Sequence, residues 1–437
     1  MEFKQRRTRQ LQEMGEGSGL FFAAPERVRN GSVLHSYRQS SDFFYLTGFE
    51  EPEAALLLCA HRESGDQVHL FLRERDPERE IWDGVRLGVE AAPERLGVDQ
   101  AYPLHTLKEK LPALLEGASS LHYQFGDELE RDREVLAAVK RSQLAERRGA
   151  QVIHQLHDLR GTLHRHRWQK SVEEQAAMRA AAALAARGHR RAMEIAEPGI
   201  YEYQLQAAME QLWREAGSPR NAYPSIVGSG PMACILHYHE NHRRCEEGEL
   251  VLIDAGCELR GYASDITRSW PVNGRFSHAQ RALYELALAA QEEALKLCRV
   301  GESLHSVHER TVEVLTQGFC DLGLLSESPS EAIETQSYRR YYMHKTSHWI
   351  GADVHDVGGS YEGGAPLAFR EGVVLTVEPG IYVSPSDGLA PEAYRGIGLR
   401  IEDDVLVTAG APEILSADAP KRPEELEALI GTRRGRG

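Results

Sequence analysis

Two aspartates near the middle of the chain are the residues best suited to chemistry. The apolar run Leu250-Val251-Leu252-Ile253 is typical of a buried strand and ends in Asp254, and Asp265 follows a Gly-containing turn. Burying an unpaired carboxylate is costly, so this one needs a partner. A hairpin with a second strand at Tyr262-Ala263-Ser264 would bring both carboxylates to one point. There they repel each other unless a proton or a cation lies between them, and we expect a metal ion.

The second half of the chain repeats this pattern. Val373-Val374-Leu375-Thr376-Val377 ends in Glu378, and Gly398-Leu399-Arg400-Ile401 ends in Glu402. A single carboxylate at a strand end is usually a solvated surface group. Apolar strands that end in an acid in both halves of the chain are difficult to explain as surface charge.

Three histidines, His344, His348 and His355, lie close together between these strands. A lone histidine is more often a core residue than a ligand, but here at least one is expected to bind metal. Two divalent ions would be neutralised by four carboxylates, and an imidazole adds a ligand without adding charge. Oxygen ligands with one nitrogen suit manganese, cobalt or iron better than a thiolate-rich zinc site. Magnesium is disfavoured because it seldom takes imidazole.

The motifs around these residues resemble those of the aminopeptidase P family, the Xaa-Pro aminopeptidases of the bacterial type. This group belongs to the metallopeptidases with the pita-bread fold. The resemblance is carried by residues 253–256, 263–268, 347–351, 353–358, 376–382 and 398–403. Residues 37–43 and 45–49 resemble the N-terminal domain of that group, so the similarity covers nearly the whole chain.

The resemblance implies a set of five metal ligands for two ions, which in this family are usually manganese. Asp254 would bind one ion, Asp265 and Glu402 would bridge both, and His348 and Glu378 would complete the second site. The residues that the resemblance places at the substrate are His237, His344, His355 and Arg400. Glu378, His355 and His237 would also take part in catalysis.

The function implied is release of the first residue from peptides whose second residue is proline. Metal ions lower the pKa of a bound water molecule, which would attack the first carbonyl carbon. His355 and one ion would stabilise the oxyanion, and Glu378 would carry the proton to the leaving proline nitrogen. Proline has a fixed φ and no N–H, so a shaped apolar pocket could select it.

Four rival functions share parts of this pattern. A prolidase would cleave only Xaa-Pro dipeptides with the same metal site, and activity on tripeptides separates the two. A binding module that had lost catalysis should lack ligands, whereas all five positions here can bind metal. A creatinase-like hydrolase should also lack part of the set, and a methionine aminopeptidase would not need this N-terminal domain.

One departure from the family pattern is Lys345, where the family often has glycine, followed by Thr346. A lysine near the pocket mouth could bind a peptide carboxylate, but it is expected to point to solvent. The ligands are unaffected. Trp82 is a second residue of interest, because an exposed tryptophan on a loop is typical of an interface as well as of ordinary packing.

The helices expected in the second part of the chain come in pairs. Ser171 with Glu174 forms a capping box for a long helix to about residue 196, followed by a helix over about 202–216. Ser277 caps another long helix, to residue 299, followed by a helix over about 303–320. Each pair precedes strands that carry carboxylates, over about 171–270 and 277–408. We interpret this as an internal repeat about a pseudo-twofold axis, which would bring the carboxylates together.

The first part of the chain has α/β character and few residues suited to chemistry. Strands are predicted at 20–24, 43–46, 54–59 and 68–72, and helices within the first ~20 residues, at 107–115 with Thr106 as N-cap, and at 128–138. The basic segment 160–169 is predicted to be a linker. We therefore expect an α/β domain over 1–165, serving oligomerisation and the site entrance, and an α+β pita-bread domain over 166–437.

Composition limits the partners. The 437 residues carry a net charge of −15, which disfavours nucleic acid and anionic membranes. No apolar run is long enough to cross a bilayer and no signal core follows the charged N-terminus, so a cytoplasmic location is expected. Six scattered cysteines indicate reduced thiols. A large first domain without chemistry predicts a homo-oligomer, a dimer or tetramer, and the basic tail 433–437 is expected to be disordered.

Overall fold

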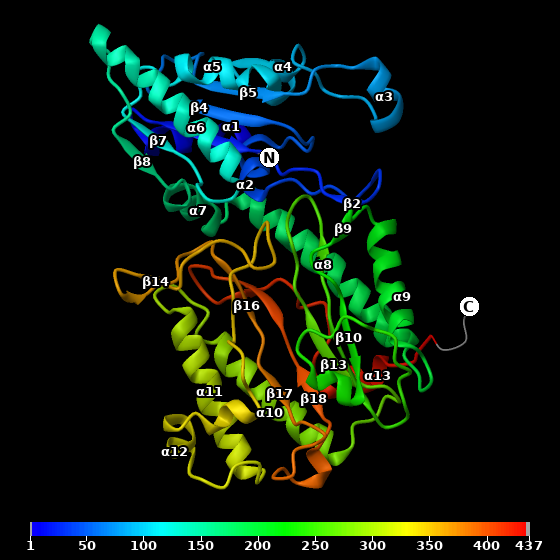
Figure 1. Ribbon diagram of the computed structural model, residues 1–437. Coiled ribbons are helices and arrows are strands. Elements are labelled where there is room, and N and C mark those ends of the chain that lie inside the picture. Colours follow the sequence, from blue (N-terminus) through cyan, green and yellow to red (C-terminus); the bar gives the residue numbers. More distant parts are fainter. Residues whose placement is uncertain (1, 434–437) are drawn as a thin grey trace. The chain divides into compact units, whose positions relative to one another are not determined.

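The chain divides into two compact units, unit 1 up to Arg167 and unit 2 from Trp168 (Figure 1). The structure is a computed structural model and describes residues 2–433. Residues 434–437 of the predicted basic tail lie outside the described residues, whereas Arg433 forms an ion pair with Glu194. The helices of unit 1 are α1 (Phe3–Met14), α2 (Ser41–Thr47), α3 (Pro77–Asp83), α4 (Ala92–Leu96), α5 (Leu107–Leu114), α6 (Leu129–Ser142) and α7 (Arg160–Trp168).

Unit 1 is built on a six-stranded sheet in the order β6-β5-β4-β1-β7-β8. Its strands are β1 (Ser18–Phe22), β4 (Ala55–Cys59), β5 (Val68–Leu72), β6 (Gln100–Pro103), β7 (Ser120–His122) and β8 (Gln155–His157), beside a hairpin of β2 (Val28–Asn30) and β3 (Val33–Leu34). Side chains alternate along β4, so that Leu56 and Leu58 pack with α1 and α2, whereas Leu57 packs with α5 and α6. Both faces of the sheet are therefore covered by helices.

Two predictions for unit 1 are wrong. Residues 43–46 form part of helix α2, because Ser40 caps the Phe43 N–H and Gly48 ends the helix with a φ of 65°. A short aromatic run cannot be assigned to strand or helix from periodicity alone. The predicted linker, residues 160–169, is mostly helix α7, and the boundary between the two units falls within it, after Arg167. Thr106 does not cap α5, since its hydroxyl donates to the Pro103 carbonyl.

Unit 2 contains two similar halves. The first has α8 (Val172–Ile195) and α9 (Glu202–Glu215) with the antiparallel sheet of β10 (Ile226–Ser229), β11 (Leu250–Asp254) and β13 (Thr267–Pro271). The second has α10 (His278–Leu295) and α11 (Leu304–Asp321) with the antiparallel sheet of β16 (Val374–Val377), β19 (Asp403–Leu406) and β20 (Glu413–Ile414). The capping box of Ser171 and the N-cap at Ser277 are confirmed, and Ser277 also forms a capping box with Gln280.

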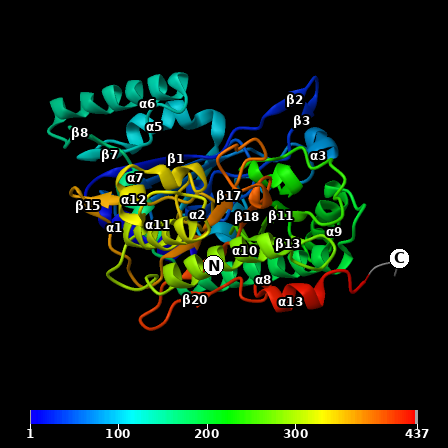
Figure 2. The same cartoon turned by 90° about the horizontal axis from the view of Figure 1, so that it is seen from below.

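The remaining elements of unit 2 are short. They are α12 (Pro329–Glu334), α13 (Pro423–Leu429) and the strand pairs β9 (Arg220–Asn221) with β12 (Cys257–Glu258), β14 (Tyr361–Glu362) with β15 (Ala365–Pro366), and β17 (Gly380–Tyr382) with β18 (Gly398–Arg400). Figure 2 shows α13 beside α8, which it contacts. The largest apolar cluster contains side chains from both halves, among them the fully buried Trp213, Trp270 and Phe319. One shared core therefore joins the two halves.

The hairpin predicted after Asp254 exists with a different second strand. The partner of β11 is β13, which begins after Asp265, and Asp254 lies opposite Thr267. Tyr262 forms only a single bridge, to Leu259. Both aspartates nevertheless lie at the same end of the strand pair, as the prediction required.

Two further features follow from the described residues. None of their helices is long and apolar enough to cross a membrane. The six cysteines are free thiols, as predicted.

Candidate metal centre and active site

One cavity of unit 2, with a volume of about 320 Å³, is lined by every site residue that the sequence analysis singled out. These nine residues are Asp254, Asp265, His348, Glu378, Glu402, His237, His344, His355 and Arg400. Because they come from both halves of the unit, the fold brings together side chains up to about 165 residues apart in the chain.

The metal-ligand candidates surround His348. Its Nε2 atom lies 3.4 Å from a carboxylate oxygen of Asp265, 3.7 Å from Glu378 and 4.0 Å from Glu402. Potential ligand atoms of Asp265, His348 and Glu402 all lie within 4.8 Å of one another. The Nδ1–H of His348 donates to the Trp349 carbonyl, which turns Nε2 toward the carboxylates. A metal-binding imidazole needs its other ring nitrogen held in this way, so that Nε2 can bind the ion once its proton is displaced.

Backbone and side-chain hydrogen bonds hold these carboxylates in place. The Asp265 N–H donates to Asp404, and the Glu378 N–H donates to the Thr346 carbonyl. The Thr267 hydroxyl donates to a Glu402 carboxylate oxygen at 2.6 Å. The three acids sit at or beyond strand ends, where the chain is free to turn toward a common point.

Asp254 is connected to the cluster through Tyr223. The Tyr223 hydroxyl lies 2.5 Å from an oxygen of Asp254 and 2.5 Å from an oxygen of Asp265. A hydroxyl has a single proton, so it can donate to only one of these carboxylates at a time. Tyr223 therefore leaves one of these two carboxylates without its proton, and that carboxylate needs another donor or a cation.

The pKa shifts in the cluster also indicate that it lacks positive charge. Burial raises the pKa of Glu402 well above its usual range, with the nearby Asp265 as the next cause. Burial also raises the pKa of Glu378, to about 7. Burial lowers the pKa of His348, but Asp265 and Glu378 outweigh it and raise that pKa to about 9. Asp265 and Glu402 are buried, and Asp254 and Glu378 are partly buried. These four carboxylates carry more negative charge than one guanidinium and one imidazole can neutralise, and a pair of divalent cations fits this donor set.

Arg400 supports the site from within. Its guanidinium is buried and donates to Asp254 at 2.5 Å, to the Tyr382 hydroxyl at 2.7 Å and to the Thr267 hydroxyl at 3.1 Å. Arg400 lines the cavity, and these contacts also connect it to Asp254 and Tyr382. Its role in binding substrate stays a prediction. The Tyr382 hydroxyl in turn lies 2.9 Å from Nε2 of His344.

The histidines on the substrate side have different environments. Burial lowers the pKa of His344 to about 3, and its Nδ1–H donates to the Lys345 carbonyl. Burial also lowers the pKa of His355, whose ring packs edge-on against His348. Both rings are therefore neutral near pH 7 and add no charge to the cavity.

The segment that carries His237 is held by a buried carboxylate at the start of α9. Glu202 accepts from the Ser229 N–H and hydroxyl at 2.7 Å each, and from the Tyr238 hydroxyl at 3.0 Å. The ring of His237 stacks on that of His239. Glu202 thus fixes both ends of the segment that places His237 in the cavity.

Two lining residues were missed by the sequence analysis. His239 lies two positions after His237, and this spacing was a usable signal. Tyr223 is followed by Pro224 and has no neighbouring acid or histidine in the sequence. Only the pairing of β10 with β11 brings Tyr223 to Asp254.

Comparison with known proteins places this site in a family. Residues 176–409 match Metallopeptidase family M24, and residues 3–123 match the aminopeptidase P N-terminal domain. The chain belongs to metallopeptidase family M24, and it is a metallo-aminopeptidase. Membership of this family, together with the cluster of Asp265, His348 and Glu402, indicates a site for divalent metal ions.

Within that family the similarity to Xaa-Pro aminopeptidases extends over the whole chain. The Xaa-Pro aminopeptidase of Escherichia coli (strain K12) is 43% identical over 430 residues, 98% of this chain and 97% of that protein. The Xaa-Pro aminopeptidase of Haemophilus influenzae is 42% identical over 435 residues, 98% of this chain and 97% of that protein.

Solved structures agree in fold. The aminopeptidase PepP of Pseudomonas aeruginosa superposes with a TM-score of 0.95 at 44% identity, covering 98% of this chain and 97% of that one. The zinc-substituted aminopeptidase P of E. coli in complex with product also gives 0.95, at 42% identity, covering 99% and 98%. The predicted family resemblance and the pita-bread fold class are therefore confirmed.

Proposed function

We propose that this protein uses two metal ions to release the first residue of peptides that have proline in the second position. The observation that carries the proposal is one cavity in which four carboxylates meet one imidazole whose Nε2 faces them. The similarity to Xaa-Pro aminopeptidases along the whole chain supports this function over that of a prolidase.

The proposed ligands are the five residues deduced from the family resemblance. Asp254, Asp265, His348, Glu378 and Glu402 would hold the two ions, as the resemblance implies. We propose manganese as the metal, because oxygen ligands with a single nitrogen suit it. When bound, the ions lower the pKa of a water molecule and supply positive charge to the substrate carbonyl oxygen.

The protein side chains supply the proton transfers and the orientation. Glu378, within 4 Å of both His344 and His348, takes the proton of the attacking water and returns it to the leaving proline nitrogen. His355 and His237 face the cavity and donate to the carbonyl oxygen as charge develops there. Asp254 attracts the free amino group of the substrate, which accounts for cleavage at the N-terminus.

The test compares a dipeptide and a tripeptide on the same protein. Metal-stripped protein is incubated with Xaa-Pro and with Xaa-Pro-Xaa, each with and without manganese, beside the Glu378→Ala variant. We expect manganese-dependent release of the first residue from the tripeptide, abolished in the variant. Cleavage of the dipeptide alone would indicate a prolidase. Bound metal without cleavage of either peptide would indicate a non-catalytic peptide-binding homologue.

We also propose that unit 1, the α/β domain, mediates assembly into a dimer or tetramer. Helix α3 and the residues just after it leave three large apolar side chains in solvent, Ile81 and Trp82 on the helix and Val85 beyond its end, each more than three-quarters exposed. Exposed apolar side chains that lie so close together in the chain are typical of an interface between copies. Light scattering at micromolar concentration tests this, and a monomer would overturn it.

A further inference from the structure

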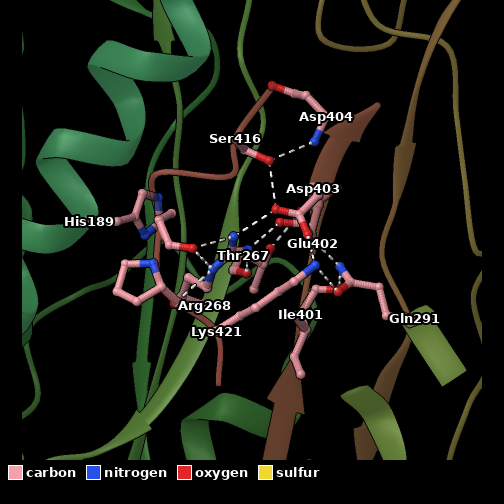
Figure 3. A network of polar contacts seen from close by, with 12 residues as sticks. His189, Thr267, Arg268, Gln291, Ile401, Glu402, Asp403, Asp404, Ser416 and Lys421 are labelled. Carbon is pink, nitrogen blue, oxygen red and sulfur yellow. Dashed lines mark hydrogen bonds and ion pairs between the residues drawn. The ribbon is translucent and has the colours of Figure 1, made fainter. Parts of the chain in front are cut away.

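A cluster of buried polar side chains surrounds Asp403, the residue that follows Glu402 (Figure 3). Asp403 is fully buried and accepts from Arg268, Lys421 and Ser416 at 2.6 Å each, and from Gln291 at 3.1 Å. A buried carboxylate needs such partners, and two cations are more than one charge requires. None of these five residues lines the cavity of the metal centre.

Gln291 of α10 connects this cluster to two ligand-bearing segments. Its Nε2 lies 3.2 Å from the carbonyl oxygen of Val377, 3.2 Å from that of Ile401 and 3.1 Å from Asp403, so its two hydrogens are shared among three acceptors. These residues immediately precede Glu378 and Glu402 in the chain. Both carbonyls lie where the chain leaves a strand, so a side chain supplies the donor that a neighbouring strand would otherwise give.

Lys421 determines which way the Gln291 amide points. Its ammonium group donates to Oε1 of Gln291 at 2.8 Å and to Asp403 at 2.6 Å. Ammonium only donates, so Oε1 must face Lys421 and Nε2 must face the two carbonyls. The amide orientation thus follows from the network of hydrogen bonds.

Arg268, from the first half of unit 2, forms further hydrogen bonds to the backbone near the metal-ligand candidates. Its guanidinium donates to the Glu402 carbonyl at 2.5 Å and to the Thr267 carbonyl at 3.0 Å. Thr267 is the residue whose hydroxyl bonds the Glu402 carboxylate. The cluster therefore contacts the backbone directly beside Glu378 and Glu402, and also at Thr267, two residues after Asp265.

We propose that Gln291 and Lys421, together with Asp403, are positioning residues that hold Glu378 and Glu402 at the separation two metal ions require. The inference rests on the proposed function, since it takes these two glutamates as ligands. Ligands of a metal pair must be held within about 0.5 Å, which needs supporting contacts of this kind. These residues do not touch the substrate and act only through the two glutamates.

The decisive variant is Gln291→Met, which keeps the side-chain length and removes the amide. Its matched control is Gln280→Met, on the same helix, where a buried glutamine donates instead to the Gly248 carbonyl, outside the ligand-bearing segments. Metal-stripped proteins are titrated with manganese by calorimetry, and the manganese pair is followed by electron paramagnetic resonance. The kcat and KM for a Xaa-Pro-Xaa tripeptide and the Tm are measured beside them.

We expect Gln291→Met to bind one manganese ion about 10- to 100-fold more weakly and to lose the resonance signal of the coupled pair. Its kcat should fall with little change in KM. The Gln280→Met variant should lose a similar amount of thermal stability and keep wild-type manganese binding and kcat. Lys421→Met should resemble Gln291→Met more weakly, and Lys421→Arg should restore binding.

Wild-type manganese affinity in Gln291→Met would overturn the inference, as would an equal loss in Gln280→Met. If Gln291→Met does not fold, the two Lys421 variants decide, since that side chain is partly exposed. Failure of the wild-type protein to bind manganese would overturn the proposed function and this inference together. A wild-type protein that binds two ions while all variants match it would overturn the inference alone.

Discussion

In the first half of unit 2, His189 of helix α8 forms a hydrogen bond at the end of strand β11, the strand that carries Asp254. In the second half, Gln291 of α10 forms one at the end of strand β16, which precedes Glu378. The Nε2–H of His189 donates at 2.9 Å to the carbonyl of Ala255, directly after Asp254. Gln291 donates to the carbonyl of Val377, directly before Glu378. The two halves thus share an arrangement of helix and strand but differ in the side chain that joins them.

The difference shows what the repeat preserves. Each half needs a buried hydrogen-bond donor for the backbone carbonyl next to its metal-ligand candidate. Either an imidazole or an amide can supply that donor. An imidazole titrates and an amide does not, so the halves should respond differently to acid. The geometry is preserved while the residue type is free to change, which explains why the repeat is weak in the sequence.

The largest expected effect tests whether both halves are equally necessary to the metal centre. Asp265→Asn removes a proposed bridging ligand of the first half, and Glu402→Gln removes one of the second. We expect each to lower kcat/KM for a Xaa-Pro-Xaa tripeptide by about a thousandfold or more, because a two-metal site acts as a unit. Metal content after dialysis should fall in both. Near-normal activity in either variant would show that its half is dispensable.

The next effect tests how strongly the halves are joined. Arg268 of the first half forms a fully buried ion pair with Asp403 of the second. Arg268→Met should lower the free energy of unfolding by about 3 kcal/mol, because Asp403 keeps only part of its neutralising charge. Denaturant unfolding measures this change. The control Arg281→Met, on the surface of α10, should change it by less than about 0.5 kcal/mol, and equal losses would contradict the argument.

A smaller effect separates the two joining side chains by pH. Burial lowers the pKa of His189 to about 4, whereas an unfolded chain has a histidine pKa near 6.5. Below about pH 6.5 the unfolded chain binds a proton that the folded protein does not, so stability is lost as the pH falls toward 4. Between about pH 8 and pH 5 this histidine should remove about 2 kcal/mol.

The variant His189→Gln, which copies the side chain of the second half, should reduce that dependence on pH. Urea unfolding at pH 8 and pH 5 gives the free energy of unfolding for both proteins. The variant is expected to be less stable at pH 8 and to decline less between the two values. An unchanged decline would mean that the acid sensitivity arises elsewhere.

The smallest effect concerns the cavity rather than the metals. Among the described residues that line the cavity, Lys345 of the second half is the one exposed lysine or arginine. Lys345→Gly should raise KM less than about fivefold for a tripeptide with a free carboxylate, as for an exposed ion pair, and leave kcat unchanged. An amidated tripeptide is the control. A large fall in kcat would place Lys345 in the catalytic machinery.

Local patterns in the sequence were sufficient for much of the fold and site. An apolar run that ends in an acid is visible within six residues, and this signal identified Asp254, Glu378 and Glu402. The capping box at Ser171 and the N-cap at Ser277 located the starts of the long helices, because a helix cap is also a local signal. The error at residues 43–46 has the opposite cause, because a four-residue aromatic run fits both a strand and a short helix.

Taken alone, the sequence determined which side chains can bind metal and which helices precede them, because residue type and spacing are local properties. The tertiary structure alone decided the contacts that hold those side chains. Tyr223 meets Asp254 across 31 residues, Gln291 meets Val377 across 86, and Arg268 meets Asp403 across 135. Partners so far apart leave no mark in a local pattern, since only the packing of the two halves brings them together.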